Sequence, residues 1–167
     1  MPHPLVLALF PSPAVAAEAA RALHAVGVSR DKISVVARSH DEEGVLAREM
    51  DATPGVDLED SRAAAVLGEL SGQVLAAIAM VLPGVGPIVT AGPLSAELGE
   101  AAGHAAGSVS SVLTSSGVPP GRAAEIEREV ESGSILLAVH ATGDDVEAIK
   151  DALEAHQPPF TLVANWQ

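Results

Sequence analysis

Two strand-helix-strand patterns, one at each end of the chain, constrain the fold more than any other feature of the sequence. LVLALF (residues 5–10) is a short apolar run that ends at a proline, and ISVVAR (residues 33–38) is rich in β-branched residues, so both patterns predict strands. Ser12 can cap a helix between them, and Pro13 suits the first helical position. Residues 1–40 are therefore predicted to form a β-α-β unit.

The same order returns at the C-terminal end. SILLAVHA (residues 134–141) and FTLVANW (residues 160–166) are strand-like, and the T-x-x-D signal of Thr142 and Asp145 predicts the start of a helix between them. Before this unit, GRAAEIEREVESG follows two prolines and predicts another helix with a partly solvated face. Residues 121–167 thus hold a helix and the second β-α-β unit.

Two β-α-β units commonly assemble into a four-stranded antiparallel sheet with two helices on one face, the ferredoxin-like sandwich. The sequence therefore predicts an α+β protein of this architecture. The segment between the units is much longer than an ordinary connection, so it is expected to be an insertion with structure of its own. Residues 41–60 are a polar, helix-like stretch followed by an acidic, turn-rich linker, and residues 61–120 are predicted to form a long helical hairpin.

In the predicted hairpin, the outbound helix is capped by Asp60 or Ser61 and runs to Leu82, and the return helix begins near Pro93. The turn between them is rich in proline and glycine. Its residues are Pro83, Gly84, Gly86, Pro87, Gly92 and Pro93.

Small residues recur at every fourth position along both predicted helices. They are Ala64, Gly68, Gly72 and Ala76 on the outbound helix, and Gly99, Gly103, Gly107 and Ser111 on the return helix. A glycine inside a helix costs roughly 1 kcal/mol relative to alanine, so close packing has to compensate. The two ridges are expected to face each other within the hairpin or to face the same ridges of another subunit. The predicted helix-packing and oligomer interface is Gly68, Gly72, Ala76, Gly99, Gly103 and Gly107.

Composition excludes several classes of function. The 167 residues are 48% hydrophobic but only 2% aromatic, so the core must come from Ala, Val, Leu and Ile, and base-stacking platforms are not expected. The formal net charge of −13 repels phosphate backbones, so nucleic acid is not an expected partner. Without cysteine the chain has no disulfide, no thiolate metal site and no thiol nucleophile.

No pattern of catalytic or metal-ligating residues emerges. The six histidines are scattered without H-x-x-x-H or H-E-x-x-H spacing, and the acidic clusters lack the spacing of a calcium loop. His104 is interpreted as a hydrogen-bonded interface residue beside the ridge, and His140 either as a pH-responsive group or as a strand-end histidine without a function. PGVGP fails the phosphate-loop pattern, and the serines lack a G-x-S-x-G elbow. The expectation is no catalytic residue, metal, cofactor or small-molecule substrate.

A membrane anchor is the alternative interpretation of the hairpin. Residues 74–96 carry no charged side chain and would be long enough for a span. However, prolines interrupt this run, and Glu97 and Glu100 follow close to the tip, where burial of a charge in lipid costs at least about 2.5 kcal/mol. The apolar run near the N-terminus is also short for a signal-peptide core. We therefore expect a cytoplasmic protein with a protein-buried hairpin, with membrane association as the alternative.

Three segments carry a family resemblance. LVLALFPSPAVAAEAARALHAVGVSRDKISVVARS resembles the general stress protein 17M-like (YflT-type heat-induced stress protein) domain. LPGVGPIVTAGPL resembles the proline–glycine turn in the small-residue hairpin of longer bacterial relatives described as stress- or low-temperature-induced proteins, and GVPPGRAAEIEREVESGSILLAVHA is similar to the helix and strand that follow there. The resemblance implies a stress-associated, non-enzymatic protein and supplies no catalytic residue.

The resulting hypothesis is a stress-associated structural or interaction protein that acts through self-assembly, with other copies of itself as the expected partner. An aliphatic hairpin longer than the sandwich can cover would otherwise expose an apolar patch that monomers rarely tolerate. Two alternatives stay open: a peripheral membrane or envelope-associated protein, and a small-ligand sensor of the kind found at the edges of ferredoxin-like sheets or dimers.

Overall fold

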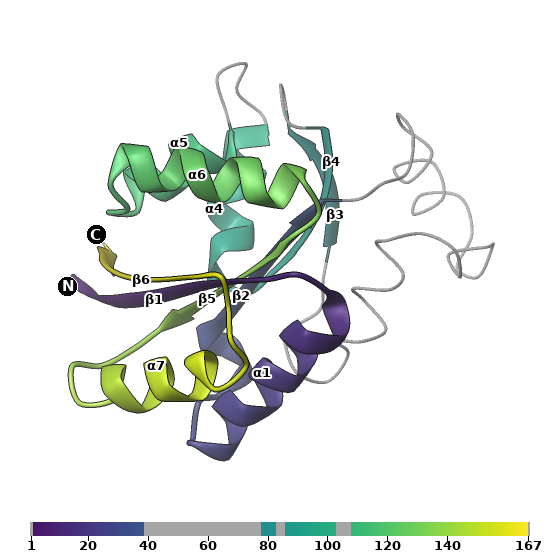
Figure 1. The fold of residues 1–167 in the computed structure, drawn as a ribbon. Coiled ribbons are helices and arrows are strands. Elements are labelled where there is room, and N and C mark those ends of the chain that lie inside the picture. The colour runs from purple at the N-terminus through teal and green to yellow at the C-terminus, as the bar shows by residue number, and fades with distance from the viewer. Residues whose placement is uncertain (1, 39–77, 83–85, 103–107, 167) are drawn as a thin grey trace.

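A computed structural model describes residues 2–38, 78–82, 86–102 and 108–166 (Figure 1). Its elements, in chain order, are β1 (His3–Phe10), α1 (Pro13–Ala25), a short 3-10 helix η1 (Arg30–Lys32), β2 (Ile33–Arg38), β3 (Ile78–Leu82), β4 (Gly86–Ala91), α4 (Pro93–Ala102), α5 (Val109–Ser115), α6 (Pro120–Glu131), β5 (Ile135–His140), α7 (Val146–Glu154) and β6 (Phe160–Trp166).

The strands form one sheet in the order β3-β4-β2-β5-β1-β6, and every neighbouring pair is antiparallel. The two β-α-β units interleave, because β5 of the second unit lies between β1 and β2 of the first. The predicted α+β class with an antiparallel sheet is confirmed. The four strands of the two units are contiguous in the sheet, and the insertion adds β4 and β3 beyond β2.

Helices cover both faces of the sheet. Figure 1 shows α1 and α7 on one face and α4, α5 and α6 on the other. Side chains alternate along β1 accordingly: Val6, Ala8 and Phe10 belong to the cluster under α1 and α7, whereas Leu5, Leu7 and Leu9 belong to the cluster under the other three helices. The sheet is therefore a middle layer, and the expectation of helices on one face alone describes only α1 and α7.

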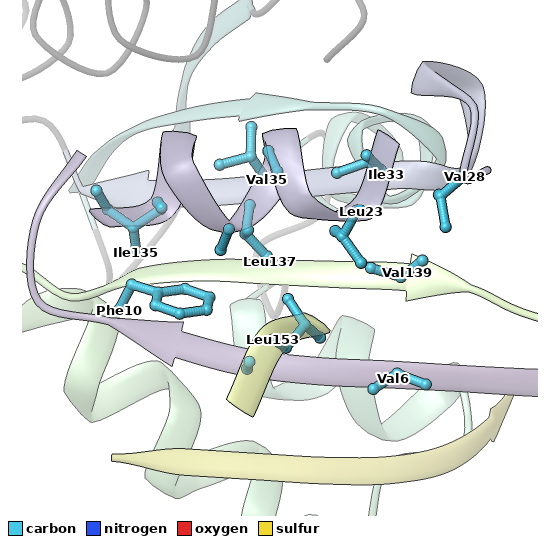
Figure 2. Close-up of a cluster of buried hydrophobic side chains, with 14 of the residues drawn as sticks. Val6, Phe10, Leu23, Val28, Ile33, Val35, Ile135, Leu137, Val139 and Leu153 are labelled. Carbon is cyan, nitrogen blue, oxygen red and sulfur yellow. The ribbon is translucent and has the colours of Figure 1, made fainter. Parts of the chain in front are cut away.

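The core under α1 and α7 is built from aliphatic side chains around a single aromatic ring, Phe10 (Figure 2). Val35 and Leu137 come from adjacent strands, and Leu23 and Leu153 approach them from α1 and α7. The buried face of α1 is otherwise alanine: Ala16, Ala17, Ala19 and Ala20. Small side chains let the helix lie close to the sheet, so dense packing replaces the large contact area that aromatic rings would provide.

The predicted start signals of α1 and α6 are confirmed. The Val15 amide donates to the Ser12 side chain at 3.3 Å, and Pro13 is the first residue of α1. The helix α6 begins at Pro120, directly after a second proline.

The capping prediction near Thr142 is only partly right. Its hydroxyl donates to the Asp145 carboxylate at 2.6 Å, but α7 begins later, at Val146. This hydrogen bond closes the turn before the helix instead of capping it.

The end of the predicted outbound helix is wrong. IAMVL forms β3, and the predicted turn contains β4 with Gly86 and Pro87 in it. Short apolar runs do not distinguish a helix from a buried strand by periodicity, and here the edge of β2 supplies backbone partners for β4, which in turn pairs with β3. The linker and outbound-helix predictions over residues 39–77, with Gly68, Gly72 and Ala76, lie outside the described residues, as do Pro83 and Gly84.

The return helix begins at Pro93, as predicted, and α4 is described as far as Ala102. A separate helix, α5, begins at Val109 behind the capping residue Ser108. The Ser111 side chain accepts a hydrogen bond from the Ser108 amide at 2.9 Å, and the Ser108 side chain accepts one from the Ser111 amide at 3.1 Å. Ser111 therefore completes a capping box and does not continue the predicted ridge.

Gly92 forms the corner between β4 and α4. Its φ is +83°, and a Cβ added there would lie 2.1 Å from the Ile33 carbonyl oxygen. Immediately after the corner, the Leu94 amide donates to the buried Ser34 hydroxyl of β2 at 3.0 Å, which satisfies one free amide of the helix terminus. The sequence predicts Gly92 in a turn between two helices. The structure requires glycine there because a strand turns into a helix directly against β2.

We expect Gly92→Ala to lower the free energy of unfolding by at least about 3 kcal/mol, because the new methyl group would collide with backbone and the φ angle would be strained. Urea unfolding measures this change. Gly143→Ala is the control: an added Cβ there meets nothing within 4 Å, so a change within about 0.5 kcal/mol is expected. Equal effects of the two substitutions would contradict the tight corner.

Candidate functional site

The exposed face of α4 carries the one predicted ridge glycine that the described residues include. Leu94 and Leu98 of this helix are buried in the core, whereas Gly99 is exposed. Gly103, His104 and Gly107 lie outside the described residues. Gly99 therefore faces away from the sheet. The outbound ridge lies outside the described residues, so both arrangements expected for the ridge, within the hairpin and between subunits, stay predictions.

A second candidate is a cluster of three rings at one end of the sheet: His3, His140 and Trp166, called here the histidine–tryptophan cluster. The register of β1 with β5 and β6 brings them together, since Leu5 lies opposite His140 and His3 lies opposite Trp166. Strand alternation places all three on the face that α4, α5 and α6 cover.

The contacts in this cluster are short. His3 Nε2 and His140 Nδ1 lie 2.7 Å apart and share a hydrogen bond. The Trp166 ring packs edge-on against the His140 ring, with centroids 4.6 Å apart and planes at 73°. Burial, with a smaller contribution from the charge of His3, lowers the pKa of His140 to about 4. Within the part of the chain that the structure describes, His140 Nε2 is buried and has no hydrogen-bond partner.

This geometry fits a packing cluster better than a metal centre. Two imidazole nitrogens on one tetrahedral zinc ion, each about 2.0 Å from it, would be about 3.3 Å apart, which exceeds the 2.7 Å measured here. Across the described ranges, no three His, Asp or Glu side chains lie close enough to hold a metal ion. The cluster instead fastens the end of β6 to β5 across β1. Sequence spacing missed the pair because 137 residues separate the two histidines.

Other polar side chains at or near the core, one buried and two half-buried, have structural roles. Thr90 donates its hydroxyl hydrogen to the Val35 carbonyl at 2.8 Å, which ties β4 to β2. Arg38 donates to the Glu131 carbonyl at 2.7 Å and so places a positive charge at the C-terminus of α6. Glu127 of α6 accepts a hydrogen bond from the Ser110 amide in the first turn of α5 at 2.8 Å. These contacts hold the elements around the sheet in place.

A small hollow lies on the opposite face, between the loop after α1, Lys32 and the first turns of α7. Its volume of about 50 Å³ has room for a few water molecules. Lys32 and Asp145 place opposite charges at its edge, so the hollow favours neither an anion nor a cation. His140 borders it from a strand whose alternation turns the imidazole to the other face. The hollow therefore gives little support to a ligand sensor.

No helix within the described ranges is long and apolar enough to cross a membrane.

Comparison with known proteins gives no match: no family model fits the chain, and neither a curated protein nor a solved structure matches it significantly. The resemblance to the general stress protein 17M-like domain therefore stays a prediction.

The histidine–tryptophan cluster predicts a specific pH dependence of stability. The pKa of His140 falls from 6.5 to about 4 on folding, so the unfolded chain takes up this proton at a higher pH than the folded chain. Stability should therefore decrease as pH falls from 6.5 to about 4, and this contribution should stop changing below that. Because solvent screens the half-exposed imidazole, we expect about 2 kcal/mol from this group, less than the full shift would give.

Urea unfolding over this pH range tests the prediction. His140→Gln should flatten the slope, because the side chain that takes up the proton is gone. His156→Gln, in the turn after α7 and outside the cluster, controls for the loss of an imidazole. A wild-type slope in His140→Gln would show that the pH dependence arises elsewhere.

Proposed function

We propose that this chain is a non-enzymatic, stress-associated structural or interaction protein that acts through self-assembly. The observation that carries the proposal is the orientation of α4, which buries Leu94 and Leu98 and leaves Gly99 exposed. An exposed glycine inside a helix costs roughly 1 kcal/mol relative to alanine, and no packing by the described residues offsets this cost at Gly99. Contact with a second copy would offset it, since glycine lets two helix backbones approach closely.

We also assign the part of the sheet formed by β2, β5, β1 and β6 to the ferredoxin-like class. Four antiparallel strands in this order, with α1 and α7 on one face, support the assignment. In this assignment the insertion elaborates the sandwich twice. It lengthens the sheet through β4 and β3, and it adds the layer formed by α4 and α5 together with the following α6.

The link to stress rests on the family resemblance of the N-terminal unit and of the segment around β4. A structural role agrees with it because the Arg38, Thr90 and Ser34 side chains form hydrogen bonds between separate elements of the fold. These hydrogen bonds stabilise the arrangement of helices and strands, so we expect the protein to act through contacts made by its surface.

Light scattering after size exclusion, with the full chain in detergent-free buffer, tests self-assembly. We expect a discrete oligomer that Gly99→Leu dissociates, because the larger side chain would separate the two helices. Gly143→Leu is the control, since a side chain there enters open space. A wild-type chain that stays monomeric at high concentration would contradict the proposal, as would an oligomer that tolerates Gly99→Leu unchanged.

Liposome flotation on the same sample separates self-assembly from the membrane alternative. Self-assembly predicts that the protein stays at the bottom of the gradient. A protein that floats, or that needs detergent to stay monodisperse, would favour a membrane-associated function.

A further inference from the structure

The outer strand β6 lacks the features that normally protect the edge of a sheet. Within the described residues it pairs with β1 alone, so its other side presents free backbone amides and carbonyls. Natural edge strands usually carry a charge, a proline or a bulge that discourages further pairing. The seven residues FTLVANW contain neither a charged residue nor a proline. Val163, at the middle, is 41% exposed, and Val26 is the only other exposed large hydrophobic residue among those whose burial the structure describes.

The uncharged strand β6 contrasts with the strongly negative charge of the chain as a whole. The chain carries a formal net charge of −13, so most contacts between two copies would bring carboxylates together. At β6 two copies can meet without opposing charges on the strands themselves. A strand edge also satisfies its backbone groups by pairing, whichever side chains it carries.

The sequence of β6 is complementary to itself in one antiparallel register. If a two-fold axis passes through Val163, Phe160 lies opposite the second copy's Trp166, and Leu162 lies opposite its Ala164. These four side chains lie on the sheet face that α4, α5 and α6 cover. Ala164 belongs to the core cluster under these helices, and the other three pack against it. On the other face, Val163 meets its own copy and Thr161 meets Asn165. The register thus pairs aromatic with aromatic, large with small and polar with polar.

We propose that β6 is a two-fold interface at which a second copy of this chain adds its own β6 antiparallel, centred on Val163, to form one continuous sheet. This inference rests on the proposed self-assembly but uses a different surface. The α4 helix packs against β2, β3 and β4, towards the opposite end of the sheet. A chain that associates through both surfaces would build larger assemblies than dimers.

Single cysteines test the register directly, because the chain has none of its own. Residues opposite each other in an antiparallel pair have Cα atoms about 5 Å apart, which suits a disulfide. Val163→Cys should therefore give a covalent dimer under mild oxidation, read on a non-reducing gel. Asn165→Cys is the matched control on the same strand and face. Its two copies would be about 13 Å apart, beyond the reach of a disulfide.

A mixture of Asn165→Cys with Thr161→Cys should restore cross-linking, since the register places these two positions opposite each other. No dimer from Val163→Cys, at a concentration where scattering shows an oligomer, would overturn the proposal. Equal cross-linking by the two single variants would overturn it as well, because random collisions would explain that result.

Equilibrium measurements give a second, independent readout. Val163→Glu should weaken the dimer by at least about tenfold, because two carboxylates would lie directly opposite each other. Val163→Thr, which keeps the branched shape without a charge, should change it much less. Circular dichroism checks that both variants fold. Dimer strength that is unaffected by Val163→Glu would contradict the interface.

The two proposals can fail separately. A monomer at every concentration contradicts both of them. An oligomer that Gly99→Leu dissociates, but that neither cross-links through position 163 nor responds to Val163→Glu, leaves self-assembly standing and removes β6 from it. The reverse pattern, with sensitivity at β6 alone, assigns the assembly to the strand edge.

Discussion

The pairing of β1 with β5 is the interaction on which the rest of the structure depends. It joins the two ends of the chain, and it places each β-α-β unit inside the other, so that neither unit forms a sheet without its partner. The residues of β1 from Leu5 to Phe10 are completely buried, three on each face of the sheet. Both helix layers therefore pack against a strand whose position is set by that pairing. The hydrogen bond between His3 and His140 is a direct product of the same register.

A sheet covered on both faces also explains the composition. Two helix layers need apolar side chains in two separate cores, and this chain supplies them with Ala, Val, Leu and Ile in place of aromatic rings. Alanines on α1 allow a short distance between helix and sheet, so many dispersion contacts form without large side chains. No charged side chain whose burial the structure describes is buried, so this charge stays solvated.

The two edges of the four-stranded core differ in a way that bears on function. At the β2 edge the insertion supplies β4 and β3, and α4 then packs over this extension. At the β6 edge no described residue continues the sheet, although the strand is uncharged and partly apolar. The chain extends its own sheet on one side and, in our proposal, relies on a second copy on the other. Exposed Gly99 offers a further contact of a different kind, between helices.

The sequence by itself determined the local elements of the two units. Ser12 with Pro13, and Pro120 at the start of α6, act through hydrogen bonds and φ angles within a few residues, so their effects can be predicted without knowledge of the rest of the fold. Only the tertiary structure decided the conformation of IAMVL and GPIVTA, because an apolar run fits a helix or a strand until the β2 edge offers it backbone partners. The tertiary structure also decided the direction in which Gly99 faces, because the burial of Leu94 and Leu98 sets the orientation of α4. It brought His3 and His140 together as well, through the register of β1 and β5.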